Sequence, residues 1–409
     1  MALKRFMVVD HNSDTTMQLK SLLGEMRMQD VTLSTNSEEA LGLIGPKRIE
    51  FIVVNWELKP ISGLAFIQRV RANAASAHMP FLIYSARLKG EEVRLLEDMG
   101  ISNVVPFPLD RNKVIDAVKS ITSREDALDP TVRELRTVTA MVGAGQLKEA
   151  MERLLPTTAT AKAKDLAYTL KGDIECRQQA YKESEKSLGT AIEANAKNKG
   201  AQQVLAKVYS QTGRHKEAIN MLGKLCDSSP LNVSNLLSLS GAFITADRHE
   251  EAGEVLAKVS DIDRTNPTAR DQKGTMAFKS GDFELAKELL QATPNGDEMC
   301  RTLNNIAIGM VSKGDFDKGI SSYRAAIEIM QDKNLSHLLK YNLGLAFKKA
   351  EKWQEAMQVL GESVLENPSF EKSRTSFEHV VKLMKSKKLT VDEEFVAKVS
   401  GAKGASRAA

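Results

Sequence analysis

Three short apolar runs near the start of the chain each end in a polar side chain that could do chemistry. These side chains are Asp10, Asn55 and Ser85. Open α/β sheets place their chemistry in the loops at the carboxyl ends of the strands, so we expect the three to share one edge of a sheet. A carboxylate there could act as a nucleophile, whereas the carboxamide of Asn55 has no anionic oxygen with which to do so. The chemistry of this edge therefore depends largely on Asn55.

The residues around these positions alternate between strand-like and helix-like patterns. Short β-branched runs predict strands, and amphipathic stretches with a capping residue and early acids predict helices. Five such β/α units predict an α/β fold with a doubly wound, five-stranded parallel sheet. The expected strands are Arg5–Val9, Val31–Ser34, Phe51–Asn55, Phe81–Tyr84 and Asn103–Pro106, and the expected helices are Thr15–Arg27, Ser37–Leu43, Leu64–Ala75, Glu91–Met99 and Arg111–Ile121.

Residues 1–123, about 30% of the chain, resemble the response-regulator receiver domain. Four motifs occur in the order and spacing of that family. Phe6–His11 is similar to its first strand and acidic pair, and Val54–Gly63 to its phosphoacceptor loop. Leu82–Ala86 is similar to its switch strand, and Val104–Pro108 to its last strand and Lys-Pro turn.

The resemblance implies a chemistry for which most of the required side chains are replaced. In the family, a strand-end Asp accepts a phosphoryl group with Mg²⁺ held by that Asp and an acidic pair, a Lys contacts the phosphate, and a Ser or Thr hydroxyl reports it. Here the pair is Asp10 and His11, the acceptor is Asn55, the Lys position is Phe107, and the hydroxyl is Ser85. One carboxylate without an anionic partner is a poor Mg²⁺ site. We therefore expect a pseudo-receiver, whose phosphoacceptor pocket is degenerate and is not phosphorylated. We expect no metal, no cofactor and no catalytic residue.

Plainer interpretations of the pocket residues remain open. His11 could be a metal ligand, although a lone His at a strand end is more often a hydrogen-bonded pocket residue. Asn55 could deamidate to Asp and restore a nucleophile, but the second acid and the Lys would still be missing. Ser85 could be a strand-end hydroxyl that bonds to the backbone.

From residue 124 onward the strand patterns stop and a fixed period begins. Residues 124–130 are charged and end in Asp-Pro, which predicts a linker followed by a helix start. Small residues then recur at steps of 34, and finally of 33 and 37, with a large residue four positions after each. The small residues are Ala150, Ser184, Ala218, Ala252, Ala286, Gly319 and Ala356, and the large ones are Leu154, Leu188, Leu222, Leu256, Leu290, Tyr323 and Leu360.

This period resembles the tetratricopeptide repeat (TPR), a helix–turn–helix unit of 34 residues. We expect an all-α solenoid of about seven units over 131–368, a capping helix over 369–388 and a C-terminal tail over 389–409. Stacked units of this kind present an extended concave face. The resemblance implies that this face binds a protein or peptide.

The last two repeats carry the predicted peptide-binding groove. Asn305 and Asn342 lie 14 residues before Gly319 and Ala356, where the family often has an Asn that holds an extended peptide. The alternative is that the groove side chains are solvated residues on the faces of the helices. The other predicted groove residues are Arg301, Asn304, Tyr341, Lys348 and Lys349.

The composition restricts the class of protein further. The formal net charge is only +4 over 409 residues, which gives no case for nucleic-acid binding. Cys176, Cys226 and Cys300 are isolated, which favours a reducing compartment. The sequence contains no run of about 18 apolar residues, so no membrane span is predicted. The basic stretch after Val380 could lie on an acidic surface but is more often solvated, and Gly401–Ala409 is expected to be disordered.

These patterns together predict a cytoplasmic, non-enzymatic scaffold of bacterial two-component signalling. It would bind a partner through the repeat groove, and a partner or a second copy of the chain through the last helices and strand of the receiver-like domain. The alternatives are a phosphorylation-dependent response regulator with TPR output, and an assembly factor for pili, secretion or motility machinery.

Overall fold

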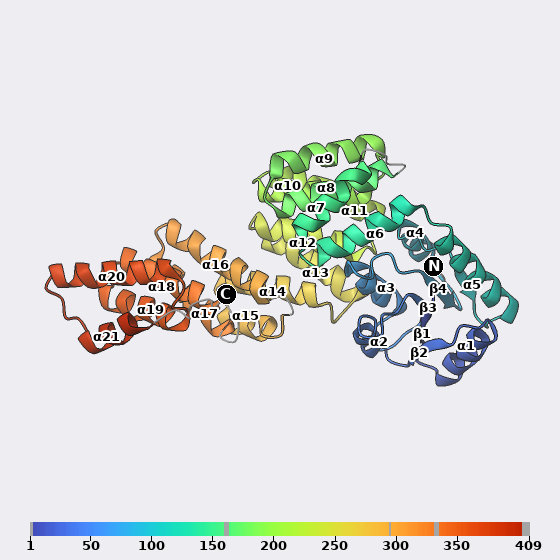
Figure 1. Ribbon diagram of the computed structural model, residues 1–409, viewed down its shortest axis with the longest axis horizontal. Helices are drawn as coiled ribbons and strands as arrows, with labels where there is room; N and C mark the ends of the chain where they lie inside the picture. Colours follow the sequence, from blue (N-terminus) through green and yellow to red (C-terminus); the bar gives the residue numbers. More distant parts are fainter. Residues whose placement is uncertain (1–2, 159–162, 294–295, 331–334, 403–409) are drawn as a thin grey trace. The chain divides into compact units, whose positions relative to one another are not determined.

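The computed structural model describes residues 3–158, 163–293, 296–330 and 335–402. They form two compact units, Met1–Asn266 and Pro267–Ala409. The first unit contains strands β1–β5 and helices α1–α13, and the second contains α14–α21 (Figure 1). None of the described helices combines the length and the apolar character that a membrane span needs.

The first unit begins with a parallel sheet between two helical layers (Figure 1). Along β1, Phe6 and Val8 pack with α1 and α5, whereas Met7 and Val9 pack with α2, α3 and α4, because side chains alternate across a strand. The sheet order β2-β1-β3-β4-β5 confirms the predicted doubly wound fold. The elements are β1 (Arg5–Val9), α1 (Ser13–Glu25), β2 (Asp30–Ser34), α2 (Ser37–Leu43), β3 (Phe51–Asn55), α3 (Gly63–Ala72), β4 (Phe81–Ser85), α4 (Gly90–Asp98), β5 (Val104–Pro106) and α5 (Arg111–Asp126).

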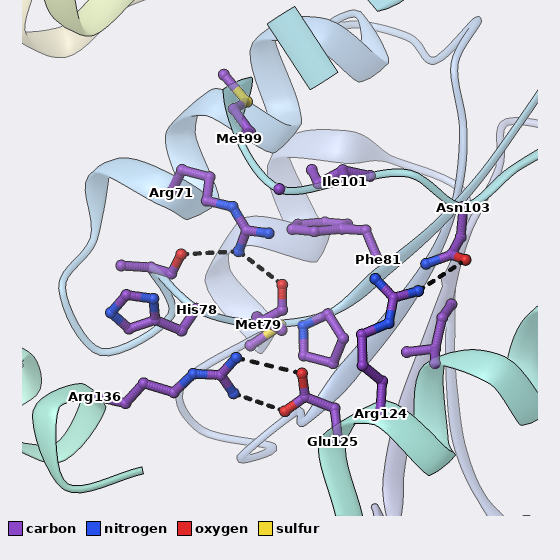
Figure 2. A pocket seen from close by; sticks show the side chains of 14 residues that line it. Arg71, His78, Met79, Phe81, Met99, Ile101, Asn103, Arg124, Glu125 and Arg136 are labelled. Atoms are coloured by element: carbon purple, nitrogen blue, oxygen red, sulfur yellow. Dashed lines mark hydrogen bonds and ion pairs between the residues drawn. The ribbon is translucent and has the colours of Figure 1, made fainter. Parts of the chain in front are cut away.

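The predicted linker over 124–130 is wrong for most of its length. Helix α5 continues to Asp126 and α6 begins at Pro130, so only residues 127–129 connect them. Two charged residues of the predicted linker make hydrogen bonds with other elements (Figure 2). Arg124 donates to Asn103 Oδ1 at 3.2 Å, and Glu125 Oε2 accepts from Arg136 at 2.6 Å. Such partners lie far enough along the chain that composition alone does not reveal them.

Antiparallel helical hairpins follow from α6 to α19 and confirm the predicted all-α repeat region. In the first unit the pairs are α6 (Pro130–Gly143) with α7 (Leu147–Thr158), α8 (Lys164–Arg177) with α9 (Tyr181–Ala194), α10 (Lys199–Gln211) with α11 (His215–Ser228), and α12 (Val233–Thr245) with α13 (His249–Ile262). In the second unit they are α14 (Pro267–Ser280) with α15 (Phe283–Leu290), α16 (Gly296–Ser312) with α17 (Phe316–Ile329), and α18 (Ser336–Lys349) with α19 (Trp353–Glu366).

Close packing within each hairpin explains the periodic small residues. The recurrent Ala, Ser and Gly positions are buried, as are the large residues four positions later. A Cβ built on Gly344 would lie 2.5 Å from Leu360 Cγ, and one on Gly172 or Gly274 would meet a Leu in the same way. The first helix of these hairpins therefore needs glycine where the large residue of the second helix crosses it.

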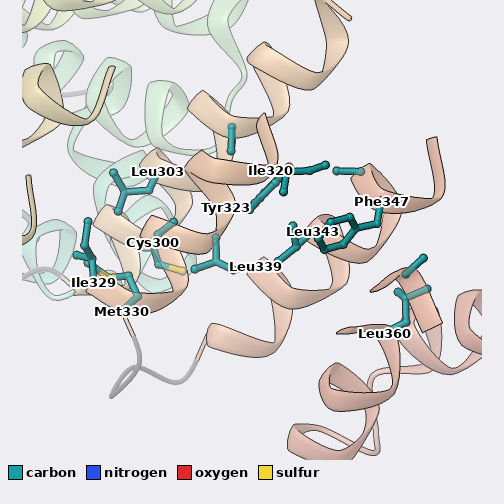
Figure 3. Close-up of a cluster of buried hydrophobic side chains, with 14 of the residues drawn as sticks. Cys300, Leu303, Ile320, Tyr323, Ile329, Met330, Leu339, Leu343, Phe347 and Leu360 are labelled. Carbon is teal, nitrogen blue, oxygen red and sulfur yellow. The ribbon is translucent and has the colours of Figure 1, made fainter. Parts of the chain in front are cut away.

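The second unit has a continuous core, part of which Figure 3 shows as side chains from α16, α17 and α18 packed between the helices. Helix α20 (Glu371–Ser386) covers the last hairpin, and a further helix, α21 (Glu393–Gly401), follows it. The predicted C-terminal tail over 389–409 thus contains a helix that the sequence did not predict, and the disorder expected from Gly401 onward is wrong at Gly401, the last residue of α21. Asp392 caps α21, and the Phe395 ring packs on Phe377 at 6.2 Å. Residues 403–409, which were expected to be disordered, lie outside the described residues.

Candidate functional site

The edge at the ends of β1 and β3 brings together a buried carboxylate and its donors. Asp10 is 1% exposed. Its Oδ1 accepts from the Asn55 carboxamide at 3.0 Å and from the Asn12 backbone N–H at 3.0 Å, and its Oδ2 accepts from the Tyr84 hydroxyl at 2.5 Å. His11 Nδ1 lies 3.2 Å from Oδ1, with its side chain 45% exposed. Protein donors therefore take both oxygens of the carboxylate.

Asn55 and Ser85 are held by a second set of hydrogen bonds. The carboxamide oxygen of Asn55 accepts from the Glu57 backbone N–H at 2.8 Å, so both ends of this side chain are bonded. Ser85 donates to Glu57 Oε1 at 2.7 Å and accepts from the Arg87 N–H at 3.1 Å. The structure thus places Ser85 with Glu57, outside the hydrogen bonds of Asp10.

Phe107 lies beside this pocket with its side chain 47% exposed, and its backbone N–H donates to the Ser85 carbonyl at 2.8 Å. Its ring supplies no charge to the pocket. Within the described ranges, no cluster of three His, Cys, Asp or Glu side chains has a geometry suited to a metal ion. The ligand and phosphoryl chemistry of the pocket residues stays a prediction.

Tyr84 is a buried pocket residue that the sequence patterns did not single out. Burial, followed by the hydrogen bond to Asp10 and the negative charges of Asp10 and Glu57, raises the pKa of Tyr84 well above its usual value. The phenol therefore stays protonated and donates to Asp10. A Tyr directly before Ser85 at the end of an apolar strand was the available signal, because a buried phenol needs a hydrogen-bond partner.

The predicted groove residues lie on α16 and α18 but are not equally free to bind. Asn342 donates to Asn304 Oδ1 at 2.7 Å, and this bond joins the first helices of neighbouring hairpins. The Tyr341 ring packs edge-on against Phe370 at 5.4 Å. The exposed side chains of the set are Arg301, Asn305 and Lys349, while Lys348 is half-buried. Peptide binding by these residues stays a prediction.

A second arrangement that the sequence did not predict is the contact between the receiver-like sheet domain and the repeats of the same unit. Gln68 on α3 donates to the Leu231 carbonyl at 3.1 Å and accepts from the Val233 N–H at 2.7 Å. Next to it, Arg69 forms two hydrogen bonds with Asp263, of 2.8 and 2.5 Å. Helix α3 therefore binds the segments that join one hairpin to the next.

The end of α4 extends this contact. Asp98 Oδ2 accepts from Lys199 Nζ and from Ser229 Oγ, both at 2.6 Å. Partial burial raises the pKa of Asp98, but the hydrogen bonds from Lys199 and Ser229 and the charge of Lys199 lower it overall. A Cβ on Gly143 of α6 would lie 2.2 Å from Ala74 Cβ, so the backbones also approach closely there.

Comparison with known proteins identifies both kinds of domain. The model of the response regulator receiver domain matches residues 6–119, and a tetratricopeptide repeat model matches residues 200–230. The chemotaxis protein CheY of Pseudomonas aeruginosa is 21% identical over 120 residues, which are 29% of this chain and 97% of that protein.

Solved structures resemble each part separately. A response regulator receiver protein from Pseudomonas putida is 27% identical and covers 29% of this chain and 98% of its own, with a TM-score of 0.27. A tetratricopeptide repeat protein from Parabacteroides merdae is 14% identical and covers 61% of this chain and 98% of its own, with a TM-score of 0.40. This chain therefore joins a response regulator receiver domain to tetratricopeptide repeats, the composition of a response-regulator-like signalling protein with protein-interaction repeats.

Proposed function

We propose that this chain is a cytoplasmic, non-enzymatic adaptor, an atypical response regulator that is not switched by phosphorylation. The observation that carries the proposal is the Asp10 carboxylate, whose two oxygens accept from Asn12, Asn55 and Tyr84. A Mg²⁺ ion needs several oxygen ligands in octahedral geometry, whereas Asp10 is followed by His11 in place of a second acid and already accepts protein hydrogen bonds at both oxygens. The Asn55 carboxamide offers no nucleophilic oxygen for an acyl phosphate.

Phosphorylation is tested with the full chain, a small-molecule phosphodonor such as acetyl phosphate, and Mg²⁺. We expect intact-mass spectra without an added phosphoryl group. Trp56 is buried directly after Asn55, so its fluorescence would report Mg²⁺ bound at this site. We expect Mg²⁺ to leave that fluorescence unchanged. A Trp353→Phe background removes the other tryptophan signal. A stoichiometric, base-labile phosphoryl adduct would instead support the phosphorylation-dependent regulator.

Two surfaces support binding of protein partners. The exposed groove residues Arg301, Asn305 and Lys349 lie on the first helices of two neighbouring hairpins, within a solenoid of the kind that presents an extended concave face. On the receiver domain, Val93, Val104 and Phe107 are large apolar side chains exposed by 39%, 37% and 47% on α4 and around β5. Two binding surfaces on one chain would raise the effective concentration of one partner near another.

The groove is tested by pull-down from native cells with the full chain and its Asn305→Ala variant. Asn305 is exposed, so its loss should reduce capture of a groove partner without affecting the fold. Asn304→Ala is the matched control for a structural effect, because Asn304 is buried and accepts from Asn342. Equal recovery of every partner with Asn305→Ala would remove the groove from the proposal. If only Asn304→Ala loses both thermal stability and capture, Asn304 has a structural role in the repeats.

A further inference from the structure

A cavity of about 240 Å³ lies at the end of the sheet opposite to Asp10, where the receiver domain meets the first repeat helix. Its walls come from the segment that enters β4, the segment that enters β5, the end of α5, and α6. Figure 2 shows Arg71, Arg124 and Arg136 directed into this space, with Glu125 as the carboxylate among them. Three guanidinium groups and one carboxylate line the space, so the lining carries an excess of positive charge.

Arg71 is the most constrained of these cations. Its Nη1 donates to the Ala77 and Met79 carbonyls at 2.9 and 2.7 Å, and its guanidinium carbon lies 5.0 Å from the centre of the Phe81 ring. Its Nε is buried and has no hydrogen-bond acceptor among the described residues. Burial and then the charge of Arg136 lower the pKa of Arg71 to about 10, although Glu125 opposes this. The guanidinium is charged at neutral pH but lacks a carboxylate partner of its own.

The carboxylate of the cavity does not meet this need. Glu125 is bound by both ends of Arg136, at 2.6 and 3.3 Å. Arg124 makes only long contacts, to Asn103 at 3.2 Å and Ser102 at 3.4 Å, and its side chain is exposed. Shielded charges in proteins are normally paired, so an anion that contacts Arg71, and also reaches the exposed Arg124, would supply the partner that Arg71 lacks.

We propose that this cavity binds a compact dianion, a small metabolite that carries a phosphate or two carboxylates. The volume is below the range of roughly 300–1,000 Å³ typical of drug-sized ligands, which favours such a small molecule. The ligand would contact Arg71 and Arg124 from the receiver domain and Arg136 from α6, and would thereby hold the two together. This site is separate from both the degenerate phosphoacceptor pocket and the repeat groove, and does not depend on the function proposed for them.

The test is calorimetric titration of the full chain with inorganic phosphate, glycerol 3-phosphate and succinate at constant ionic strength. We expect saturable binding of at least one probe, and the comparison of probes distinguishes a phosphate from a dicarboxylate ligand. Arg124→Gln should weaken binding by at least about tenfold, because it removes one charge-assisted hydrogen bond. Arg94→Gln is the matched control, since Arg94 is an exposed arginine on α4 outside the cavity.

Two further measurements separate a specific site from general attraction to a basic surface. Glu125→Gln should tighten binding, because it removes the competing carboxylate and keeps a hydrogen-bond acceptor for Arg136. Burial and the charges of Arg136 and Arg71 lower the pKa of His78, so a bound anion should raise that pKa in NMR titrations. No saturable binding of any probe, or equal weakening by Arg124→Gln and Arg94→Gln, would overturn the proposal.

Discussion

Replacing Arg69 with Ala is expected to open the contact between the receiver domain and the repeats. Arg69 is 17% exposed and Asp263 is 2% exposed, so the pair is largely shielded from water. Removing one partner of a buried ion pair destabilises by about 3–5 kcal/mol, because the other charge stays buried. Asn266 still donates to Asp263 at 2.8 Å in the variant. We therefore expect the lower end, about 3 kcal/mol, which corresponds to roughly a hundredfold change in the opening equilibrium.

Hydrogen exchange of the full chain measures this local opening without requiring two-state unfolding. Amides of α3 and of the segment around Val233 should exchange roughly a hundredfold faster in Arg69→Ala. Arg111→Ala is the control, because the Arg111–Glu25 pair is exposed by 63% and 51% and such pairs contribute about 0–1 kcal/mol. Adding Asp263→Asn to Arg69→Ala should restore much of the protection, since no unpaired charge remains. Unchanged exchange in Arg69→Ala would refute the conclusion that this ion pair stabilises the contact between the receiver domain and the repeats.

Three further predictions concern the pocket, the repeats and pH. Tyr84→Phe should lower the free energy of unfolding by about 1–3 kcal/mol in urea titrations, because a buried carboxylate loses a donor. Gly344→Ala should lower it by about 1–3 kcal/mol through the clash with Leu360, whereas Gly189→Ala, with no atom within 4 Å of the new Cβ, should be neutral or stabilising. The contribution of Asp98 is present above its ordinary pKa of 3.8 and is lost as the pH falls through its lower folded value. Exchange around Ser229, corrected for its intrinsic pH dependence, should therefore lose less protection at low pH in Asp98→Asn than in the unaltered chain.

Strands and helical hairpins could be predicted because their signals are local in the sequence. Contacts between residues far apart in the chain could not. The strands Arg5–Val9 and Phe51–Asn55 agree to the residue with β1 and β3, because β-branched runs and strand-end polar residues are local signals. The hairpins follow from a spacing that steric contact imposes, such as Gly344 against Leu360. The partner of Arg69 lies 194 residues away, and no local pattern connects the two.

The same reasoning explains the two boundary errors. Residues 124–126 had the composition of a linker, but Glu125 is fixed by Arg136 from the next helix. The tail contains a helix because Phe395 finds an apolar surface on α20, and a Cβ on Gly361 would lie 2.4 Å from that ring. In each case the contact that orders the segment joins two elements, and local sequence patterns do not reveal that these elements pack together. Polar composition alone therefore led to the wrong linker and did not reveal the helix in the tail.

Helix α3 connects the pocket of Asp10 and Asn55 to the repeats, which bears on how the proposed adaptor would work. Its first residue, Gly63, lies so close to the Asn55–Trp56 backbone that a Cβ would come within 2.6 Å of the Trp56 carbonyl oxygen. One to two turns later, Gln68 and Arg69 bind the repeat segments. The uncharged Asn55 side chain is hydrogen-bonded at both ends. Under the proposed function it accepts no phosphoryl group, so the start of α3 does not move in response to phosphorylation. The receiver domain would then hold the first repeats in a fixed arrangement, and any switching would have to come from a ligand or partner that competes with the contacts of Arg69 and Asp98.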